Sequence, residues 1–138
     1  MFEPHVSEQL RQFLRECIET HEDLETLMLL VREHEAAWPP DRVASALGGP
    51  AEMSLRALER LTQAGLLSEH QAAGQRFFRF APSADLRAPV AELLETYGEH
   101  RLPIMNEISS NAVQRVRTAA MRAFARAFLL DGKGKDRG

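Results

Sequence analysis

The sequence predicts a mainly α-helical protein with one small β-hairpin, on two observations. Apolar residues recur at helical spacing along most of the chain. The stretch Leu61–Pro82, LTQAGLLSEHQAAGQRFFRFAP, interrupts that pattern with a helix end, a glycine, a strand, a glycine-bearing loop and an aromatic strand. Two short helical patterns come before this stretch, so the predicted order is helix, helix, hairpin.

Size and composition are those of an ordinary globular protein. The 138 residues fit one domain with helical extensions, and 44% of them are hydrophobic and 27% charged. The longest apolar run, Leu27–Val31, is far shorter than the roughly 18–20 residues of a membrane span. The N-terminus lacks the basic and apolar regions of a secretion signal, and the single cysteine, Cys17, suits a reducing compartment. These features favour a cytoplasmic protein with no membrane partner.

Charge is distributed unevenly along the chain. The net charge is −3, but residues 1–37 carry nine acids and three bases, whereas residues 111–138 carry two acids and seven bases. The acidic and basic ends can therefore pair, within one subunit or between two. Net charge alone says little about nucleic-acid binding, because the local charge of the contacting surface decides it.

Two amphipathic helices are predicted before residue 36. Ser7 is a candidate N-cap of the first helix and Thr20 of the second, with Asp23 in a weak capping box. The apolar positions of the first are Val6, Leu10, Phe13, Leu14, Cys17 and Ile18, and those of the second are Leu24, Leu27, Met28 and Val31. The segment Ala36–Pro40 ends the second helix, because proline excludes the preceding residue from helical geometry.

The next elements form the predicted helix-helix-hairpin unit. A short helix over Asp41–Leu47 and a turn at Gly48–Pro50 lead to a longer helix over about Ala51–Ala64, which ends at Gly65 in the left-handed conformation. Leu55, Leu58 and Leu61 are expected to face inward. Strands over Leu66–His70 and Arg76–Ala81 follow, joined by a tip over residues 71–75. Phe78 and Phe80 share one face of the hairpin, and Phe77 and Arg79 the other.

Helices are predicted again after Pro82. Leu86, Val90, Leu93, Leu94 and Tyr97 mark one, whose start is ambiguous because of Pro89. Gly98 and Pro103 predict a break, and Ser109, Ser110 or Asn111 can cap a last helix. The predicted organisation is an N-terminal helix (1–19), a winged helix-turn-helix domain (20–82), C-terminal helices for dimerisation (83–130) and a disordered tail (131–138).

Two groups of residues carry a family resemblance. Leu58, Leu61, Gly65, Leu66 and Leu67, followed by Arg76–Pro82, resemble the winged-helix regulators of the MarR, PadR and ArsR types. The segments Cys17–Thr20, Glu22–Glu25 and Arg122–Phe128 are similar to a group of small, largely uncharacterised bacterial winged-helix proteins. The resemblance implies a bacterial, cytoplasmic transcriptional regulator. The acidic pair Glu52 and Glu59 on the recognition helix departs from what tight DNA binding requires.

A DNA-contacting set follows from this fold. The helix over residues 51–64 would enter the major groove, where arginine can grip guanine. Wing side chains would touch phosphates or the minor groove, and Arg76 is favoured over Arg79 because it lies closer to the tip. The candidates are Ser54, Arg56, Arg60, Gln71, Gln75, Arg76 and Arg79. Arg56 and Arg60 can instead form ordinary exposed ion pairs on a solvated face, and the hairpin can simply be polar on its exposed face.

The last helix combines an apolar stripe with several arginines. It can lie on an anionic membrane, bind DNA phosphates or pair with a second copy across a two-fold axis. Pairing is favoured because the acidic N-terminal third can complement the basic end. The predicted dimerisation residues are Val113, Val116, Phe124 and Phe128.

No motif indicates catalysis or a cofactor. The chain has no nucleophile elbow, P-loop, GxGxxG or HExxH sequence, and its five histidines lack metal-ligand spacing. Glu22 and Asp23 are expected on a solvated helix face, and Cys17 as an inert thiol. The sequence therefore predicts a homodimeric regulator that binds double-stranded DNA, with an unknown effector, and the alternative is a winged-helix protein-interaction module without DNA binding.

Overall fold

The protein is described here by a computed structural model, which covers the backbone of residues 6–137 and the side chains of residues 6–129. Its helices and strands follow one another as α1 (Glu8–Cys17), α2 (His21–Arg32), α3 (Pro40–Leu47), α4 (Ala51–Gln63), β1 (Leu67–Ala72), β2 (Gln75–Phe80), the 3₁₀ turn η1 (Ala84–Leu86), α5 (Arg87–Glu99) and α6 (Arg101–Arg137).

Side-chain caps begin α1 and α2, as the sequence predicts. The Ser7 hydroxyl accepts a hydrogen bond from the Leu10 N–H at 3.1 Å, and the Thr20 hydroxyl accepts one from the Asp23 N–H at 3.0 Å. Each cap satisfies an amide that has no partner within its helix. The predicted starts of both helices are confirmed.

A left-handed glycine ends α4 and turns the chain toward the hairpin. Gly65 has φ of 91°, the Leu66 N–H donates to the Leu61 carbonyl, and the Gly65 N–H donates to the Thr62 carbonyl. This pair of bonds is the Schellman arrangement. A Cβ on residue 65 would also lie 3.3 Å from the Ser83 hydroxyl. The predicted role of Gly65 is confirmed.

The hairpin is tighter than the sequence suggests. β1 and β2 pair antiparallel from Leu67 opposite Phe80 to Ala72 opposite Gln75. The connection is only Ala73–Gly74, with φ of 53° and 76°, the two positive values of a type I′ turn. The prediction of a five-residue tip over 71–75 is therefore wrong, because the right-handed twist of the strands favours a two-residue turn of this type.

Trp38 forms an isolated antiparallel β-bridge with Phe78 of β2. Its N–H donates to the Phe78 carbonyl at 2.7 Å, and the Phe78 N–H donates to the Trp38 carbonyl at 2.9 Å. The sequence singles out Trp38 only as part of a helix end. The pairing anchors β2 to the chain between α2 and α3.

The C-terminal helices are longer than predicted. Pro89 lies in the first turn of α5, where its missing N–H costs little. The predicted break falls at His100, but α6 then runs without interruption from Arg101 to Arg137. A helix cap at Ser109–Asn111 is therefore wrong, since those residues continue the helical hydrogen bonds. The sequence predicts a disordered tail over residues 131–138. The backbone of residues 131–137 instead continues α6, and Gly138 lies outside the described residues.

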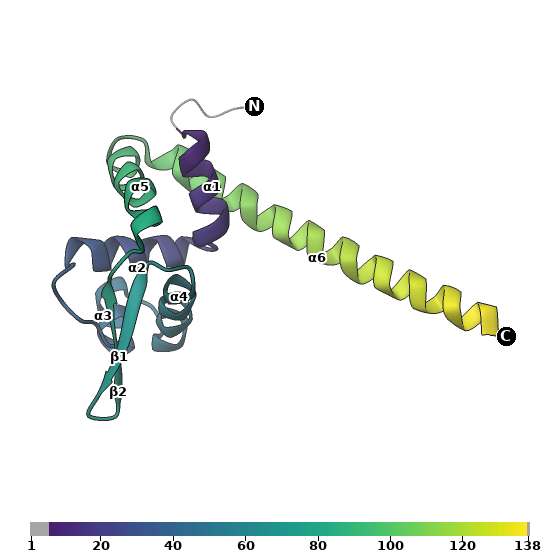
Figure 1. Ribbon diagram of the computed structural model, residues 1–138, viewed down its shortest axis with the longest axis horizontal. Coiled ribbons are helices and arrows are strands. Elements are labelled where there is room, and N and C mark those ends of the chain that lie inside the picture. The colour runs from purple at the N-terminus through teal and green to yellow at the C-terminus, as the bar shows by residue number, and fades with distance from the viewer. Residues whose placement is uncertain (1–5, 138) are drawn as a thin grey trace.

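One hydrophobic core joins the helices around the hairpin. Buried side chains come from α1, α2, α4, α5 and the start of α6, for example Leu10, Leu27, Leu58, Leu93 and Ile104. In Figure 1 the hairpin lies at one end of this body, and α6 leaves it from beside α1 as a long rod. The order α3, α4, β1, β2 is that of a winged helix-turn-helix, so the predicted fold class, mainly α with a small hairpin, is confirmed.

Candidate nucleic-acid interface

The outward face of α4 is the first part of the candidate surface. Its inward face is buried and consists of Ser54, Ala57, Leu58 and Leu61. Ser54 is 1% exposed, and its hydroxyl has no hydrogen-bond partner among the described residues. A DNA contact by Ser54 is therefore excluded in this conformation. Its i, i+4 and i, i+7 spacing with Leu58 and Leu61 is the sequence signal that places it on the buried stripe.

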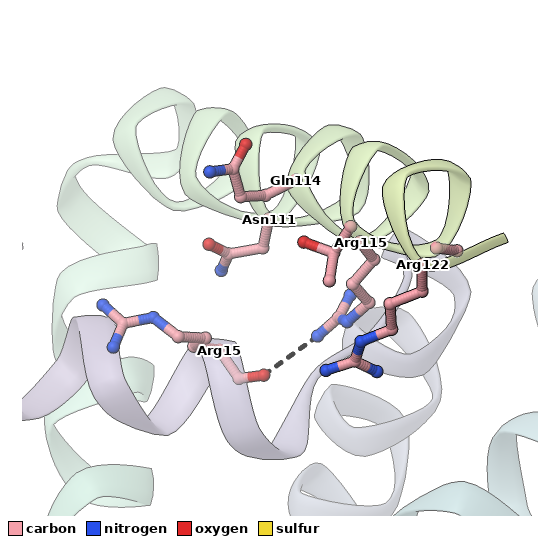
Figure 2. A pocket seen from close by; sticks show the side chains of 7 residues that line it. Arg15, Asn111, Gln114, Arg115 and Arg122 are labelled. Atoms are coloured by element: carbon pink, nitrogen blue, oxygen red, sulfur yellow. Dashed lines mark hydrogen bonds between the residues drawn. The ribbon is translucent and has the colours of Figure 1, made fainter. Parts of the chain in front are cut away.

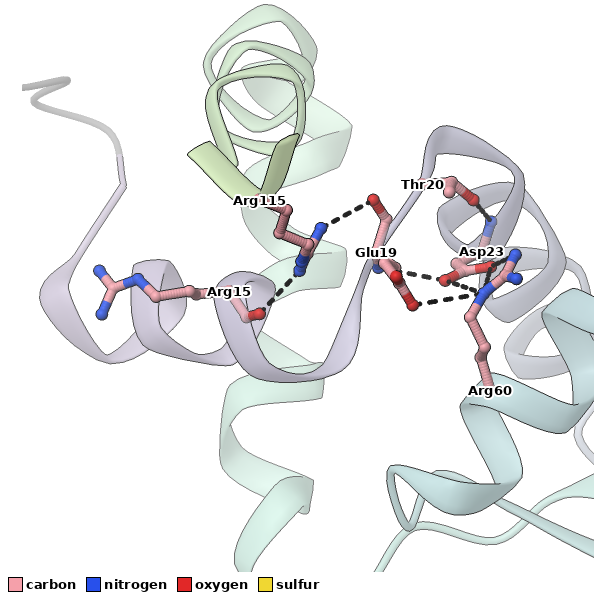
Figure 3. Close-up of polar contacts among 6 residues, drawn as sticks. All are labelled: Arg15, Glu19, Thr20, Asp23, Arg60 and Arg115. Carbon is pink, nitrogen blue, oxygen red and sulfur yellow. Dashed lines mark hydrogen bonds and ion pairs between the residues drawn. The ribbon is translucent and has the colours of Figure 1, made fainter. Parts of the chain in front are cut away.

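Arg60 faces α2 rather than the solvent in front of α4. Its Nε lies 3.0 Å from both carboxylate oxygens of Asp23, and its Nη2 lies 2.7 Å from Oδ1. The Glu19 carboxylate is 3.7 Å from its Nε (Figure 3). The hydrogen bond with Asp23 raises the pKa of Arg60, so the guanidinium keeps its charge. This geometry removes most of the donor capacity that Arg60 would need to read a base.

Asp23 corrects another expectation. The sequence predicts that it lies on a solvated helix face, yet it is 0% exposed. Its carboxylate also accepts a hydrogen bond from the Glu19 N–H at 3.1 Å. A buried carboxylate with several donors is a structural group, and here it joins the start of α2 to α4. The partner, Arg60, is 37 residues away, and helical periodicity gives no signal for such a pair.

The position of Arg56 agrees with both predictions made for it, a contact with DNA and an exposed ion pair. Its Nη2 lies 3.2 Å from the Glu52 carboxylate one turn earlier, and the two side chains are 64% and 76% exposed. Exposed pairs of this kind contribute only about 0.3–0.5 kcal/mol. Because the pair is weak, Arg56 can leave Glu52 for a base or a phosphate without a large penalty.

Arg76 joins the wing to α4. Its guanidinium donates to Glu69 on β1 through Nε and Nη2 and to Glu59 on α4 at 2.9 Å. The hydrogen bond from Arg76 lowers the pKa of Glu69, and the two carboxylates raise the pKa of Arg76. The guanidinium also lies 5.3 Å from the centre of the Phe78 ring. Because these contacts occupy its N–H donors, Arg76 is less available to bind a phosphate.

Arg79 is the better-placed wing arginine, which reverses the sequence-based preference for Arg76. Its side chain is exposed, and it pairs with no carboxylate within the described part of the chain. Gln71 and Gln75 are exposed beside the turn. A hollow of about 460 Å³ separates that turn from the first turn of α4 and is lined in part by Glu52, Gln75 and Arg76. The wing turn and the start of α4 thus border one surface.

The exposed stripe of α6 is the second candidate surface. The four predicted dimerisation residues are all exposed, from 51% at Val113 to 73% at Phe124. Phe124 and Phe128 stack with ring centres 6.4 Å apart. The structure adds Met121 and Leu129, at 72% and 65% exposure, which the sequence-based set omits. Large apolar side chains exposed in a group usually mark an interface.

The described part of the chain offers little support for a metal site, a membrane-spanning helix or a reactive cysteine. There, no group of three or more His, Cys, Asp or Glu side chains is arranged to hold a metal ion. Among the same residues, no helix combines the length and apolarity needed to cross a bilayer. Cys17 is partly buried, and burial together with Glu16 and Asp85 raises its pKa to about 11. A thiol with such a pKa is mainly protonated at neutral pH and is a poor nucleophile.

Comparison with known proteins gives no family. No family model matches the chain, and no curated protein matches it either. Among solved structures, it is similar to a homodimeric winged helix-turn-helix DNA-binding domain (fragment 1–100) from Mycobacterium bovis, a possible ArsR-family transcriptional regulator solved by NMR. The two share 18% sequence identity with a TM-score of 0.46, over 72% of this chain and 93% of that one.

Proposed function

We propose that this protein is a transcriptional regulator that binds double-stranded DNA as a homodimer. The observation that carries the proposal is the free outer face of α4 beside the wing. Arg56 on that face is exposed and only weakly paired, and Arg79, Gln71 and Gln75 are exposed on the wing. In a winged helix-turn-helix, this helix enters the major groove and the wing lies along the backbone.

The apolar stripe of α6 supports the homodimer. Val113, Val116, Phe124 and Phe128 contact no other part of their own chain closely enough to be buried. Pairing two such helices around a two-fold axis would bury them and would present two α4 helices to a roughly palindromic site. The partners proposed are therefore DNA and a second copy of this chain.

A protein-interaction module without DNA binding is the second candidate, and one observation favours it. Arg56, Arg60 and Arg76 each face a carboxylate of the same chain. Residues 20–82 together carry nine acidic and six basic side chains. This balance is net negative, so the domain attracts phosphates weakly, which suits a protein partner better than DNA.

Recovery of DNA bound to the protein across a genome separates the two candidates. Enrichment of defined sites supports the regulator. On a recovered site, Arg56→Ala should weaken specific binding by about 1–3 kcal/mol and relax the preference at one base pair per half-site. Arg79→Ala should weaken binding to all sequences alike and flatten the salt dependence, since phosphate contacts release counterions.

Arg101→Ala is the matched control. It removes the same charge at the α5–α6 junction, at the end of the body opposite the wing (Figure 1), where the guanidinium stacks on Tyr97. It should leave DNA affinity unchanged. If no site is enriched, or if Arg56→Ala and Arg79→Ala bind a recovered site as the parent does, the protein-interaction candidate takes first place.

A further inference from the structure

Arginines without carboxylate partners gather away from the wing, in a cavity between α1 and α6. The cavity has a volume of about 480 Å³. Its polar lining comes from three arginines, two amides and a hydroxyl: Arg15, Arg115, Arg122, Asn111, Gln114 and Thr118. Figure 2 shows Asn111, Arg115 and Arg122 projecting from α6 on the side that faces α1.

The charge of this cavity is uncompensated. Among residues 6–129, no acidic side chain lines it. Within the described residues, Arg15, Arg115 and Arg122 form no ion pair with a carboxylate, in contrast to Arg56, Arg60 and Arg76. The guanidinium groups of Arg115 and Arg122 point to the same side of the hollow (Figure 2), where they repel each other, and a bound anion would relieve that repulsion.

Arg115 is held in place by backbone rather than by a carboxylate. It donates to the Arg15 carbonyl at 2.9 Å and to the Glu19 carbonyl at 3.1 Å (Figures 2 and 3). These carbonyls lie at and just after the C-terminal end of α1, where the helix dipole is negative. Arg115 therefore offsets the local negative potential at the edge of the cavity without pairing with a carboxylate of the described residues.

Asn111 supplies an unused donor. Its amide nitrogen is buried and has no hydrogen-bond partner among the described residues. In Figure 2 the amide group hangs from α6 toward α1. A buried N–H without a partner is uncommon in folded proteins and is normally satisfied by a ligand or an ordered water. An anionic oxygen in the cavity would satisfy it once the amide turns to expose this nitrogen.

The cavity and the apolar stripe lie on opposite sides of α6. Arg115 comes two residues after Val113, and Arg122 two residues before Phe124. At 3.6 residues per turn, an offset of two places a side chain nearly opposite its neighbour on the helix. Pairing of two chains through the stripe would thus leave the cavity open.

We propose that this cavity binds a small, compact polyanion, such as a phosphorylated or polycarboxylate metabolite. Guanidinium groups bind phosphate and carboxylate oxygens through paired, charge-assisted hydrogen bonds. The volume lies within the range of about 300–1,000 Å³ that small-molecule sites occupy. The proposal does not depend on DNA binding, so the genomic experiment above can fail without affecting it.

Titration calorimetry with inorganic pyrophosphate tests this site. The full chain is titrated at pH 7.5 and constant ionic strength set with chloride. Saturable binding of one pyrophosphate per chain is expected. Arg122→Gln and Asn111→Leu should each weaken it by about ten-fold or more, the loss expected for one hydrogen bond to a charged group. Neither side chain has an ion-pair or hydrogen-bond partner in the described structure, so circular dichroism should show both variants folded.

Arg126→Gln is the matched control, because Arg126 is exposed one turn beyond Arg122 and does not line the cavity. It should change the affinity by less than about two-fold, as expected for a screened surface charge. The proposal is overturned by any of three results: no saturable binding at millimolar pyrophosphate, an equal loss in Arg126→Gln, or an affinity that falls as protein concentration rises. The last result would mean that a second copy fills the cavity.

Discussion

At the scale of single residues, the contact between Asp23 and Arg60 is the one that most changes the interpretation of the sequence. Asp23 is fully buried, whereas the Arg60 side chain is 32% exposed. The pair therefore holds α4 against α2. Arg60 is for that reason a poorer candidate for a DNA contact than Arg56.

Removing Asp23 should destabilise the fold. Asp23→Ala leaves Arg60 and the Glu19 N–H without their acceptor, and we expect a loss of about 2–4 kcal/mol in the free energy of unfolding. Urea denaturation measures it. Arg60→Ala alone and the double variant complete a cycle, in which a coupling energy near zero would contradict a structural role for the pair.

Leu58 tests the position of α4 in the core. It is 0% exposed, so Leu58→Ala should lower the free energy of unfolding by about 2–5 kcal/mol. Met53→Ala on the same helix is the control, because Met53 is 47% exposed, and it should cost less than about 0.5 kcal/mol. Both values come from denaturant titrations. A loss below about 1 kcal/mol for Leu58→Ala would place the residue near the surface.

Cys17 should titrate abnormally late. Burial, with Glu16 and Asp85, raises its pKa from the ordinary 9.0 to about 11 in the folded chain. The fold thus prefers the neutral thiol, and this contribution to stability is complete below pH 9 and is lost as the pH rises through 11. The rate of alkylation by iodoacetamide should rise near pH 11 in the folded protein and near pH 9 in urea. Identical midpoints would contradict the shift.

At the scale of elements, the wing and α4 are joined by Arg76. Because Glu59 comes from α4 and Glu69 from β1, this one guanidinium fixes the hairpin against α4. The same contacts neutralise a positive charge on the surface proposed to meet DNA. Arg76 can therefore either hold the wing through Glu59 and Glu69 or bind a DNA phosphate, and the two roles compete for the same guanidinium.

Replacing both carboxylates should shift that competition toward DNA. The double variant Glu59→Gln, Glu69→Gln frees the Arg76 charge and removes two negative charges, so non-specific DNA should bind more tightly and with a steeper salt dependence. Fluorescence anisotropy with a random duplex measures both. Glu95→Gln, Glu99→Gln on α5 removes the same charge far from the wing and is the control. An equal gain in the control would show a whole-molecule charge effect only.

At the scale of the whole molecule, α6 extends well beyond the core that its first turns help to build. Ile104 and Ile108 are buried in that core, whereas every residue from Val116 to Leu129 is exposed. A helix with a large exposed apolar stripe gains most of its stability from a partner, since isolated helices are marginal in water.

Breaking the apolar stripe should give monomers. Phe124→Glu, Phe128→Glu places charges where the proposed two-fold pairing buries rings, and neither side chain is buried by its own chain. Sedimentation at micromolar concentration should show a dimer for the parent and a monomer for this variant. Ala125→Glu, on the flank of the stripe, should remain dimeric. If the parent is already a monomer under these conditions, the homodimer proposal is wrong.

Local sequence determined the starts of α1 and α2, the end of α4 and the type of fold, but not the length of α6. Ser7, Thr20 and Gly65 do what their side chains or backbone freedom dictate within a few residues of each one. Such short-range interactions can be predicted from the sequence, because both partners lie within a few residues of each other.

Tertiary structure alone decided which charged groups are free. The Asp23–Arg60 pair spans 37 residues, and the Arg115 contact to the Arg15 carbonyl spans 100. The bridge from Trp38 to Phe78 likewise joins segments far apart in sequence. Helical periodicity shows which face a side chain occupies, but not which distant element that face meets. For that reason the sequence alone identified the arginines of α4 and the wing, and the structure was needed to show which of them are neutralised and where uncompensated arginines gather.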